Sequence, residues 1–504
     1  MNDVVSVING WVWSWALVAL CLGVGLFYSV MTRFVQVRML GEMVHLLSST
    51  AKSKDGISPF QAFVLALSGR VGIGNISGVA AAIGFGGPSA VFWLAVVAFL
   101  GASTAYAEST LAQVYKEQDL ITGQYRGGPA YYFEKGLGQK WFAILFALMA
   151  IVSCGVFLPG VQVNSVVSAI THITGEGADL DFLGMQAGHL RVMVMVFIVC
   201  ILGMIIVGGV ARISAFAELI VPLMAGGYVF LALLLMVINL DKVPLVVALI
   251  VSDIFNPMAG LGAAVGWGVK RGVYSSEAGQ GTGPHHAGAA EVEHPAQQGL
   301  VQASSVYVDT FLMCAATAFM ILTMDTYNVQ GNLSNGQFLI QHVDASTEID
   351  TPIFTQMALE ATFGSFGAYF TAIAVSLFAF TTVMAYYHIA EINVVYLARF
   401  FGKKAQKFAL WFVKISVLIM AAYGSLNHAS VIWAWGDVGV GMTAWLNILG
   451  VLVMFFMLSK PVIAVLDDYE QQKQAGVSTY VFDPLKLGIK NAAFWEERLK
   501  KQKK

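Results

Sequence analysis

The sequence predicts an all-α integral membrane protein with about eleven transmembrane helices, two of them discontinuous. Hydrophobic residues make up 57% of the 504 residues and charged residues only 12%, whereas soluble domains are about 25% charged. Several apolar stretches exceed the roughly 18 residues that indicate a membrane helix. The net charge of −2 does not indicate a nucleic-acid partner.

The apolar stretches predict where the spans lie. We expect them near 11–32, 58–83, 88–114, 141–170, 192–210, 213–238, 246–287, 297–324, 364–398, 406–424 and 428–458. The first span follows MNDVV, which contains no basic residue. We therefore expect a retained helix there and not a cleaved signal peptide.

The distribution of basic residues predicts the orientation. Lys and Arg gather in the loops within 33–57, 115–140 and 399–407, whereas 171–190 and 325–352 contain acidic residues and no Lys or Arg. Because positively charged loops tend to stay in the cytoplasm, the N-terminus is expected outside and the tail, 459–504, inside. The protein is expected to be a multi-pass protein of the cytoplasmic (inner) membrane, surrounded by lipid.

Two of the expected spans contain runs of glycine and polar residues. SGRVGIGNISG (68–78) interrupts the second span, and KRGVYSSEAGQGTGP (270–284) interrupts the seventh. Breaks at corresponding places in two halves of a membrane protein are the best sequence indicator of a transporter binding site. We therefore expect discontinuous helices and a binding site at these runs.

The chemistry of a helix break favours ionic ligands. In a bilayer the freed N–H and C=O groups need partners. The N–H groups and positive end of a half-helix suit an anion, and unwound carbonyls suit a hard cation such as Na+. Glycines allow the first run to unwind, and Asn75 adds a neutral oxygen. A kinked helix that packs through small residues would explain the glycines but not Arg70 and Asn75.

Two acidic residues are expected at membrane depth. Glu277 belongs to the second break and Glu108 to the third span. Acids at this depth are functional candidates, but each could instead cap the N–H groups of an unwound backbone. Both roles stay open for Glu277, and a structural role is favoured for Glu108.

Histidines and acids that follow the second break resemble a metal site only superficially. The spacing of His285, His286 and His294 with Glu291 and Glu293 matches no standard metal site. We expect a polar loop there.

Thr381 and Thr382 place two neighbouring hydroxyl groups inside an apolar span. Together with backbone carbonyls they could complete a sodium site. Alternatively, each hydroxyl bonds back to its own helix. His388 lies six residues beyond Thr382 and could titrate, although a lone histidine is more often a structural hydrogen-bonding group.

Several long motifs, taken together, resemble the alanine/glycine:cation symporter family. They are GRVGIGNISGVAAAIGFGGPSAVFW, YRGGPAYY, KRGVYSSEAGQG, HPAQQGLVQ, LFAFTTV and VFDPL. The resemblance extends from about residue 10 to residue 485. It implies a leucine-transporter-type fold of two five-helix inverted repeats. The implied divisions are an extra N-terminal helix and cytoplasmic loop (1–57), the repeats 58–238 and 239–458, and the tail 459–504.

The resemblance also implies roles for particular residues. It implies substrate binding by the backbone at Ile73 and Gly74 and by the side chains of Gln162, Tyr274 and Tyr386. The sodium ligands that it implies are the carbonyls of Ser68 and Val71 and the side chains of Asn75, Thr381 and Thr382.

The chain departs from the family pattern at a few pocket positions. The family usually has threonine in place of Ile73, tryptophan in place of Tyr386, and a proline-asparagine pair in place of Leu446–Asn447. It usually has SNEAGMGSAP where this chain reads SSEAGQGTGP. The helix-breaking glycines and the threonine pair are retained.

The function expected from these observations is sodium-coupled symport of a small neutral amino acid, alanine or glycine, into the cell by alternating access. The alternatives are a proton-coupled symporter of another amino acid such as glutamine, or a membrane amino-acid sensor that does not transport. The sequence contains no HExxH, GxSxG or Walker motif, so an enzyme is not expected. No cofactor is expected beyond the coupling ion Na+, and the oligomeric state stays open.

Overall fold

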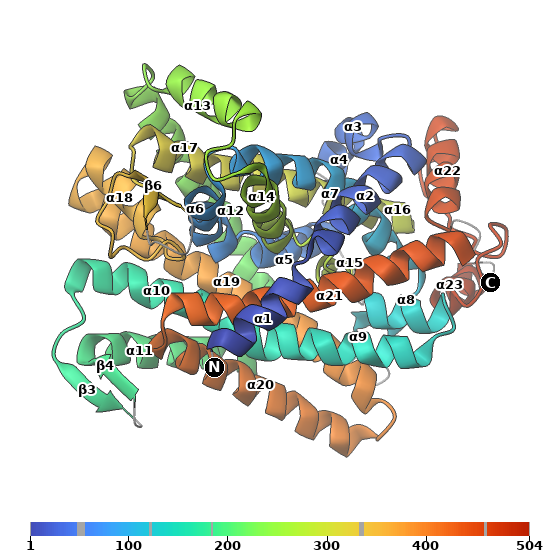
Figure 1. The fold of residues 1–504 in the computed structure, drawn as a ribbon. Helices are drawn as coiled ribbons and strands as arrows, with labels where there is room; N and C mark the ends of the chain where they lie inside the picture. Colours follow the sequence, from blue (N-terminus) through green and yellow to red (C-terminus); the bar gives the residue numbers. More distant parts are fainter. Residues whose placement is uncertain are drawn as a thin grey trace.

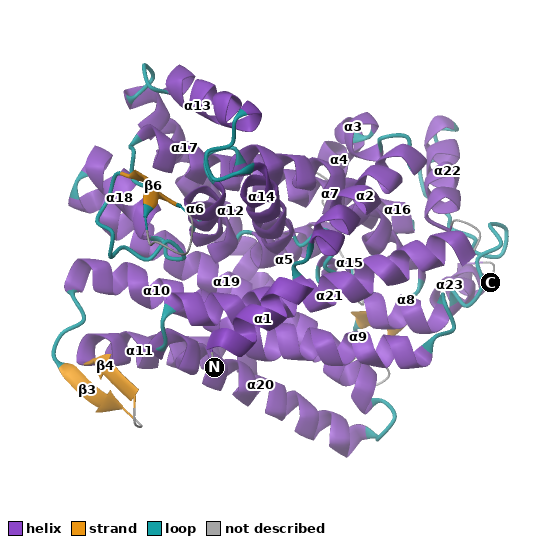
Figure 2. Cartoon of the chain, in the orientation of Figure 1, coloured by secondary structure: helices purple, strands orange, loops and turns teal. Residues whose placement is uncertain are grey.

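Long helices dominate the computed structural model, which describes residues 2–47, 56–119, 123–182, 185–331, 337–457 and 461–502. Figure 2 shows strands only in short hairpins between the helices. Residues 48–55 and 120–122, which belong to the basic loops, lie outside the described residues.

The first half of the chain contains two broken or bulged spans among continuous ones. Its helices are α1 (Asn2–Val12), α2 (Trp15–Met31), α3 (Val35–Arg38), α4 (Leu40–Leu47), α5 (Pro59–Arg70), the 3₁₀ turn η1 (Ile73–Asn75), α6 (Ser77–Gly86), α7 (Ala90–Val114), α8 (Pro129–Lys135), α9 (Lys140–Val152), the π-helical turn η2 (Ser153–Phe157), α10 (Leu158–Thr174), α11 (His189–Val207) and α12 (Gly209–Ile238).

The second half again combines broken and continuous spans. Its helices are α13 (Val243–Phe255), α14 (Leu261–Ser276), α15 (Gly283–Ala289), α16 (Pro295–Tyr307), the π-helical turn η3 (Val308–Cys314), α17 (Ala315–Thr323), α18 (Ile353–Phe363), α19 (Ser365–Ala398), α20 (Lys403–Leu426), α21 (Ala429–Met457), α22 (Pro461–Gln474) and α23 (Ala493–Gln502).

Three antiparallel hairpins, which were not predicted from the sequence, join some of these helices. They pair β1 (Glu117–Gln118) with β2 (Tyr125–Arg126), β3 (Asp179–Phe182) with β4 (Met185–Gly188), and β5 (Asn328–Gln330) with β6 (Phe338–Gln341). The last two hairpins lie within the two acidic loop segments.

The number of spans agrees approximately with the expected eleven. Among the described residues, nine helices are long and apolar enough to cross a membrane, and the bent pair α5 and η1–α6 makes ten. The remaining expected span corresponds to α14 and α15, each of which is short. The all-α membrane fold class and the first break are therefore confirmed.

The expected span 246–287 is wrong in its boundaries. It combines three helices, because α13 ends at Phe255 and α14 begins at Leu261. Several large apolar side chains of α13 are exposed, with fractions of 68% for Leu245 and 84% for Phe255. The discontinuous span is α14 with α15, and α13 is a separate apolar helix.

The two broken helices lie in the middle of the bundle. In Figure 1, α5, α14 and α15 are surrounded by α7, α19 and α21. α6 packs against α14, α15 packs against α5, and both pairs are flanked by α7. A parallel bridge joins Ile57, before α5, to Ala290, after α15. This arrangement brings the two sequence breaks together in the core.

The tail packs on one end of the bundle, opposite the β3–β4 hairpin (Figure 1). The Lys473 ammonium forms an ion pair with Glu42 of α4, and the Trp495 indole N–H donates to the carbonyl of Gln113 at 2.8 Å. Burial raises the pKa of the Glu42 carboxyl, but the hydrogen bonds from Lys473 and Tyr469 outweigh it and hold this pKa below its usual value. The tail is thus an ordered part of the structure.

Close contact between α10 and α20 depends on two glycines. A Cβ atom added to Gly424 would collide with the Cα of Gly160. The Asn164 side chain bridges the same helices by donating to the carbonyl of Gly424 at 2.9 Å. Small residues at such positions let membrane helices approach closely.

We expect Gly424→Ala to destabilise the protein by about 1–3 kcal/mol, because overpacking at this contact outweighs the helix preference for alanine. Thermal unfolding of the purified protein in detergent would measure it. Gly226→Ala on α12, where an added Cβ meets nothing within 4 Å, is the matched control and should leave stability unchanged or slightly raised. Equal effects of the two substitutions would contradict a packing role for Gly424.

Candidate functional site

The first break is a short unwound segment with its N–H groups directed at side-chain oxygens. α5 ends at Arg70, and the two halves of the span meet at an angle of 55°. The Gly72 N–H donates to Asn75 Oδ1 at 2.9 Å, and the Ile73 N–H donates to Gln162 Oε1 of α10 at 3.1 Å. The structure thus brings together Gln162 and the unwound backbone, which are far apart in the sequence.

The same break meets the threonine pair of α19. The Thr382 hydroxyl donates to the carbonyl of Ser68 at 2.8 Å. The Thr381 hydroxyl donates to the carbonyls of Leu377 and Phe378 on its own helix, both at 3.0 Å. Thr382 and the Ser68 carbonyl therefore face each other. Thr381 instead bonds to its own helix, which was the alternative to a sodium site for both threonines.

Gly72 lies between these two groups. A Cβ atom added to it would collide with Thr382 Oγ1 and would lie 3.2 Å from Gln162 Oε1. The glycine is required by this close approach of two side chains, since any larger residue would push them away from the break.

Aromatic rings cover the other side of the unwound segment. A Cβ atom added to Gly74 would lie 3.0 Å from Tyr274 Cδ1, and the Tyr274 ring lies 5.0 Å from that of Trp433 on α21. Tyr386 of α19 is a buried neighbour of Tyr274. Trp433 was not predicted from the sequence, because nothing distinguishes it there from other tryptophans in apolar spans.

Two buried polar atoms at this place have no protein partner. Gln162 and Tyr386 lie close to the Tyr274 hydroxyl, but neither this hydroxyl nor Gln162 Nε2 makes a hydrogen bond of good geometry among the described residues. Buried polar groups are normally paired, and an unpaired one costs about 1–3 kcal/mol. The arrangement can therefore accept a small polar ligand between Gln162, Tyr274 and the unwound backbone.

Asp309 is a further candidate that was not predicted from the sequence. It lies in η3 and is fully buried. Its carboxylate accepts hydrogen bonds from Asn75 Nδ2 at 2.7 Å, from the Ser275 hydroxyl at 2.9 Å and from the Thr310 hydroxyl at 2.8 Å. An acid inside the expected span 297–324 was the available signal, since such acids are functional candidates.

The second break is a turn between α14 and α15 that contains three residues with positive φ. These are Glu277 at 54° and Gly279 and Gly281 at 82° each. Glu108 accepts from the Gly279 N–H at 3.3 Å and from Asn447 Nδ2 at 2.7 Å. Asn447 in turn donates to the Gly279 carbonyl at 3.0 Å. These contacts support the structural role that was favoured for Glu108.

Glu277 does not make the capping contacts that were one of its two possible roles. It is fully buried, and although the Thr282 side chain lies close to it, neither carboxylate oxygen accepts a hydrogen bond of good geometry within the described part of the chain. A Cβ atom added to Gly69 of α5 would lie 3.3 Å from Glu277 Oε1. Glu277 therefore faces the first break across the space between the two discontinuous helices.

The expectation of a polar loop for the histidines is wrong. His285 and His286 belong to α15 and are fully buried, and His294 is the buried N-terminal cap of α16. The physical reason is that α15 is the second half of the broken span and packs between α5 and α7. Groups of three or more potential metal ligands were not found among the residues that the structure describes.

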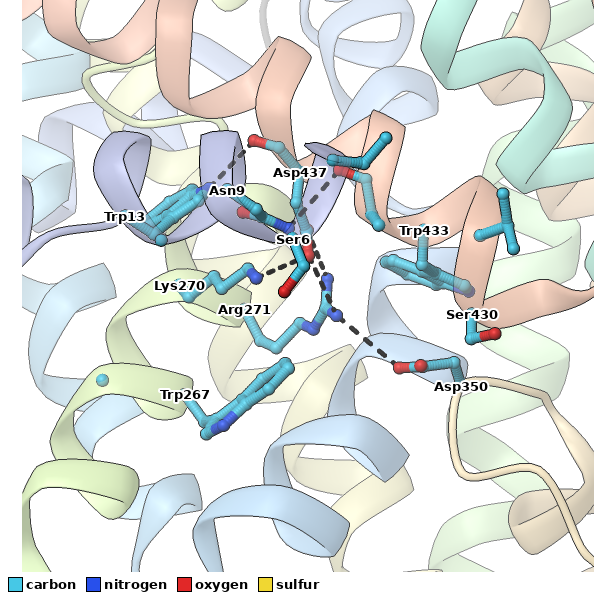
Figure 3. Close-up of a pocket in the computed structure, with 15 residues that line it drawn as sticks. Ser6, Asn9, Trp13, Trp267, Lys270, Arg271, Asp350, Ser430, Trp433 and Asp437 are labelled. Atoms are coloured by element: carbon cyan, nitrogen blue, oxygen red, sulfur yellow. Dashed lines mark hydrogen bonds and ion pairs between the residues drawn. The ribbon is translucent and has the colours of Figure 1, made fainter. Parts of the chain in front are cut away.

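A charged cluster lies at one end of this core (Figure 3). Asp437 of α21 forms ion pairs with Lys270 at 2.6 Å and Arg271 at 2.7 Å, both on α14. Arg271 also lies 3.6 Å from Asp350, which precedes α18.

The cluster borders a cavity of about 510 Å³ and adjoins the aromatic cover of the first break. The Arg271 guanidinium lies 4.4 Å from the centroid of the Trp433 ring, and that ring is next to Tyr274. The cluster therefore connects α14, α21 and the loop that precedes α18.

Comparisons with known proteins agree on the family. Residues 1–483 match the sequence profile of the sodium:alanine symporter family. YrbD of Bacillus subtilis (strain 168), named as a candidate sodium/proton-dependent alanine carrier protein, is 49% identical over 502 residues, which are 99% of this chain and 98% of that protein. GlnT of the same strain, named as a candidate sodium/glutamine symporter, is 37% identical over 482 residues, which are 94% of this chain and 92% of that protein.

A solved structure shows the same fold. MhsT in complex with L-phenylalanine superposes with a TM-score of 0.56 at 15% identity, over 88% of this chain and 97% of that one. The likeness confirms the leucine-transporter-type architecture that the motifs implied.

The geometry around Gly72 generates a direct test of the site. We expect Gly72→Ala to lower the initial rate of amino-acid uptake into vesicles by about tenfold or more, because an overpacking cost of about 1–3 kcal/mol corresponds to roughly that factor. Gly266→Ala on α14, where an added Cβ meets nothing within 4 Å, should keep the rate within about twofold. An uptake rate equal to that of the wild type in folded Gly72→Ala protein would show that the close contact of Thr382 and Gln162 with Gly72 does not form the site.

Proposed function

Because the chain belongs to the sodium:alanine symporter family, we propose that it carries a small neutral amino acid, alanine or glycine, into the cell together with Na+ by alternating access. The family consists of transporters, and the chain is a multi-pass membrane transporter and not an enzyme. The observation that carries the proposal is the position of Gly72, which lies between Gln162 on one side and Thr382 on the other.

The proposed substrate site is the space around the unwound segment. The backbone N–H groups at Ile73 and Gly74 would hold the substrate carboxylate, since N–H groups at a helix break suit an anion. Gln162 would reach the substrate from α10, with its unpartnered Nε2 as a donor. Tyr274 and Tyr386 would limit the size of the side chain, because both are bulky and buried next to the break.

The proposed sodium site lies on the Thr382 side of Gly72. Its ligands would be the carbonyls of Ser68 and Val71 and the hydroxyls of Thr381 and Thr382. Uncharged carbonyl and hydroxyl oxygens fit a hard cation such as Na+, and the Ser68–Thr382 contact supports this placement.

Asn75 is proposed to be a ligand of a second sodium ion, which would lie on the side of the unwound segment away from Thr382, next to the substrate. Its contact with the buried Asp309 carboxylate places an acidic oxygen there, which suits a cation.

Coupling would follow from the shared segment. Residues 68–75 would contribute to both ligand sites, so filling one site orders the backbone that forms the other. Inward movement of one positive charge across 100 mV provides about 2.3 kcal/mol. This free energy could drive accumulation of the amino acid.

We also propose which end faces outside. The charged cluster of Lys270, Arg271, Asp350 and Asp437 would close the outer path, and the tail would lie in the cytoplasm, as the basic loops indicate. The two repeats would comprise 58–238 and 239–458. The many exposed apolar side chains of the outer helices would contact lipid.

Two alternatives remain within the proposed architecture. One alternative is a proton-coupled carrier of glutamine or another amino acid. The name of YrbD includes a proton beside sodium and alanine, the name of GlnT includes glutamine with sodium, and the departures at Ile73 and Tyr386 lie at pocket positions. A sensor that binds but does not transport would show binding without accumulation. A transport measurement distinguishes Na+-coupled symport, proton-coupled symport and a sensor.

We expect reconstituted protein to accumulate labelled alanine or glycine above equilibrium only with an inward Na+ gradient. Labelled glutamine would be measured in the same way as the alternative substrate. Tyr386→Trp should alter the preference among alanine, glycine and glutamine. Accumulation that needs a proton gradient and not Na+ would overturn the proposed ion, and no accumulation of any label would overturn symport of these substrates.

The ligand assignment makes a separate prediction for the same assay. Asn75→Ala and Thr382→Ala should each raise the Na+ concentration for half-maximal uptake, by about tenfold if one charge-assisted contact of about 1.5 kcal/mol is lost. Thr371→Ala on α19, whose hydroxyl donates to its own helix at Gly367, is the matched control. Unchanged Na+ dependence in both of the first two variants would contradict the assignment.

A further inference from the structure

A stacked pair of histidines lies in the core outside the proposed ligand sites. His286 belongs to α15 and His388 to α19, with ring centroids 5.4 Å apart and ring planes at 20°. Their exposed fractions are 0% and 3%. None of the four ring nitrogens has a hydrogen-bond partner among the residues that the structure describes.

Other buried histidines of this chain provide an internal comparison. His285 Nδ1 lies 3.0 Å from the carbonyl of Thr282, and its Nε2 lies 2.8 Å from Asn393 Nδ2. His294 contacts the Ala296 N–H and the Asp468 carboxylate, each at 3.2 Å. Histidines with a structural role in this protein thus have both nitrogens engaged, as buried polar atoms normally do. The His286–His388 pair differs from them.

The pair joins α19, which belongs to the proposed transport site, to α15, which does not contribute a residue to it. α15 is the half-helix that follows the second break, and α19 carries Thr382. His388 is six residues further along α19, about 9 Å at the rise of an α-helix, toward its end at Ala398. The pair therefore lies on the tail side of the site, between two elements that must separate if a path opens toward the tail.

Charged groups surround the pair from several elements. Those that face the pair itself are Arg70 from α5, Arg126 from β2 and His285 from α15. One shell further out, Arg70 faces three buried acids, Glu277, Asp309 and Glu108, and Arg126 faces Glu391 of α19. Arg126 is paired with Asp119 at 3.0 Å and with Glu391 at 3.4 Å. Two arginines close to a dry pair oppose a third positive charge, so proton binding there requires water or a rearrangement of these charges.

We propose that the His286–His388 pair is a proton-binding site of the transport cycle, loaded from the tail side when α15 and α19 separate. A proton passes from water to one imidazole nitrogen when water reaches the pair. It returns to water before the core closes to the dry arrangement of this structure. Imidazole suits this role because it ordinarily titrates near neutral pH. The inference rests on the proposed function and adds H+ to Na+ as an ion that controls the cycle.

The test uses right-side-out vesicles with the external pH, the Na+ gradient and the membrane potential all fixed. Only the internal pH is varied, between about 5.5 and 8.5, to span the ordinary range of imidazole. We expect the initial rate of Na+-driven uptake by the wild type to change at least about threefold across this range. In the double variant His286→Gln/His388→Gln, the rate relative to its own maximum should become independent of internal pH.

A matched control separates this site from histidines in general. His428→Gln alters a histidine whose side chain is 85% exposed and should retain the wild-type pH profile. A pH profile that persists in the double variant would overturn the proposal. Na+-driven wild-type uptake that ignores internal pH would also overturn it while leaving symport intact, whereas no Na+-driven uptake at any pH would overturn symport itself.

A second measurement needs no substitution and covers a double variant that does not fold. Diethyl pyrocarbonate reacts with unprotonated imidazole, and mass spectrometry reads the product at each histidine. During cycling of the wild type, we expect labelling of His286 and His388 that decreases as internal pH falls through neutrality. No labelling of either residue at any pH, with His428 labelled in the same sample, would show that water does not reach the pair and would overturn the proposal.

Discussion

The structure depends on hydrogen-bond partners for the backbone N–H and C=O groups that become free where a membrane helix is broken. A continuous helix pairs its own N–H and C=O groups, but the segments at 71–76 and 277–282 pair only part of theirs locally. At the second break the protein supplies fixed partners, because Glu108 and Asn447 hold both the N–H and the C=O of Gly279. At the first break the partners are Asn75 and Gln162. One break is thus held by a stable network, and the other offers backbone to ligands.

This difference gives the two breaks different roles in the proposed mechanism. The first break can exchange protein partners for a substrate carboxylate and a sodium ion, because both sides of Gly72 are lined by polar side chains. The second break positions α15, whose neighbours include Arg70 and the unpartnered carboxylate of Glu277. The aromatic contact of Tyr274 with Gly74 and Trp433 then connects the first break to the charged cluster at the other end of α14.

Features encoded by local composition were predictable from the sequence. The glycine and polar runs at 68–78 and 270–284 marked both breaks, because such residues are unfavourable in an ordinary apolar span. The motif around Gly74 and the Thr381–Thr382 pair indicated the family. The approach of Thr382 to Ser68 and of Gln162 to Ile73 agrees with the roles that the family implied, although those roles themselves stay predictions.

Features that depend on tertiary contacts could not be predicted from local composition. The separation of α13 from α14 is an exception, because Asn256, Pro257 and Gly260 mark it in the sequence. The burial of His285 and His286 depends on α5 and α7, which lie far away in the sequence. The role of Asp309 became visible only through its hydrogen bonds with Asn75 and Ser275. That of Arg271 became visible only through its ion pair with Asp437, which is 166 residues away. Such pairings are set by the fold and not by spacing along the chain.

If one unwound segment holds amino acid and Na+ together, the two ligands bind cooperatively, and equilibrium binding to the purified wild type in detergent measures this without any gradient. Binding of labelled alanine would be measured over a range of Na+ concentrations, and Na+ binding over a range of alanine concentrations. Each ligand should tighten the binding of the other by the same factor, because linkage between two sites is reciprocal. Alanine affinity that is equal in Na+ and in choline would contradict it.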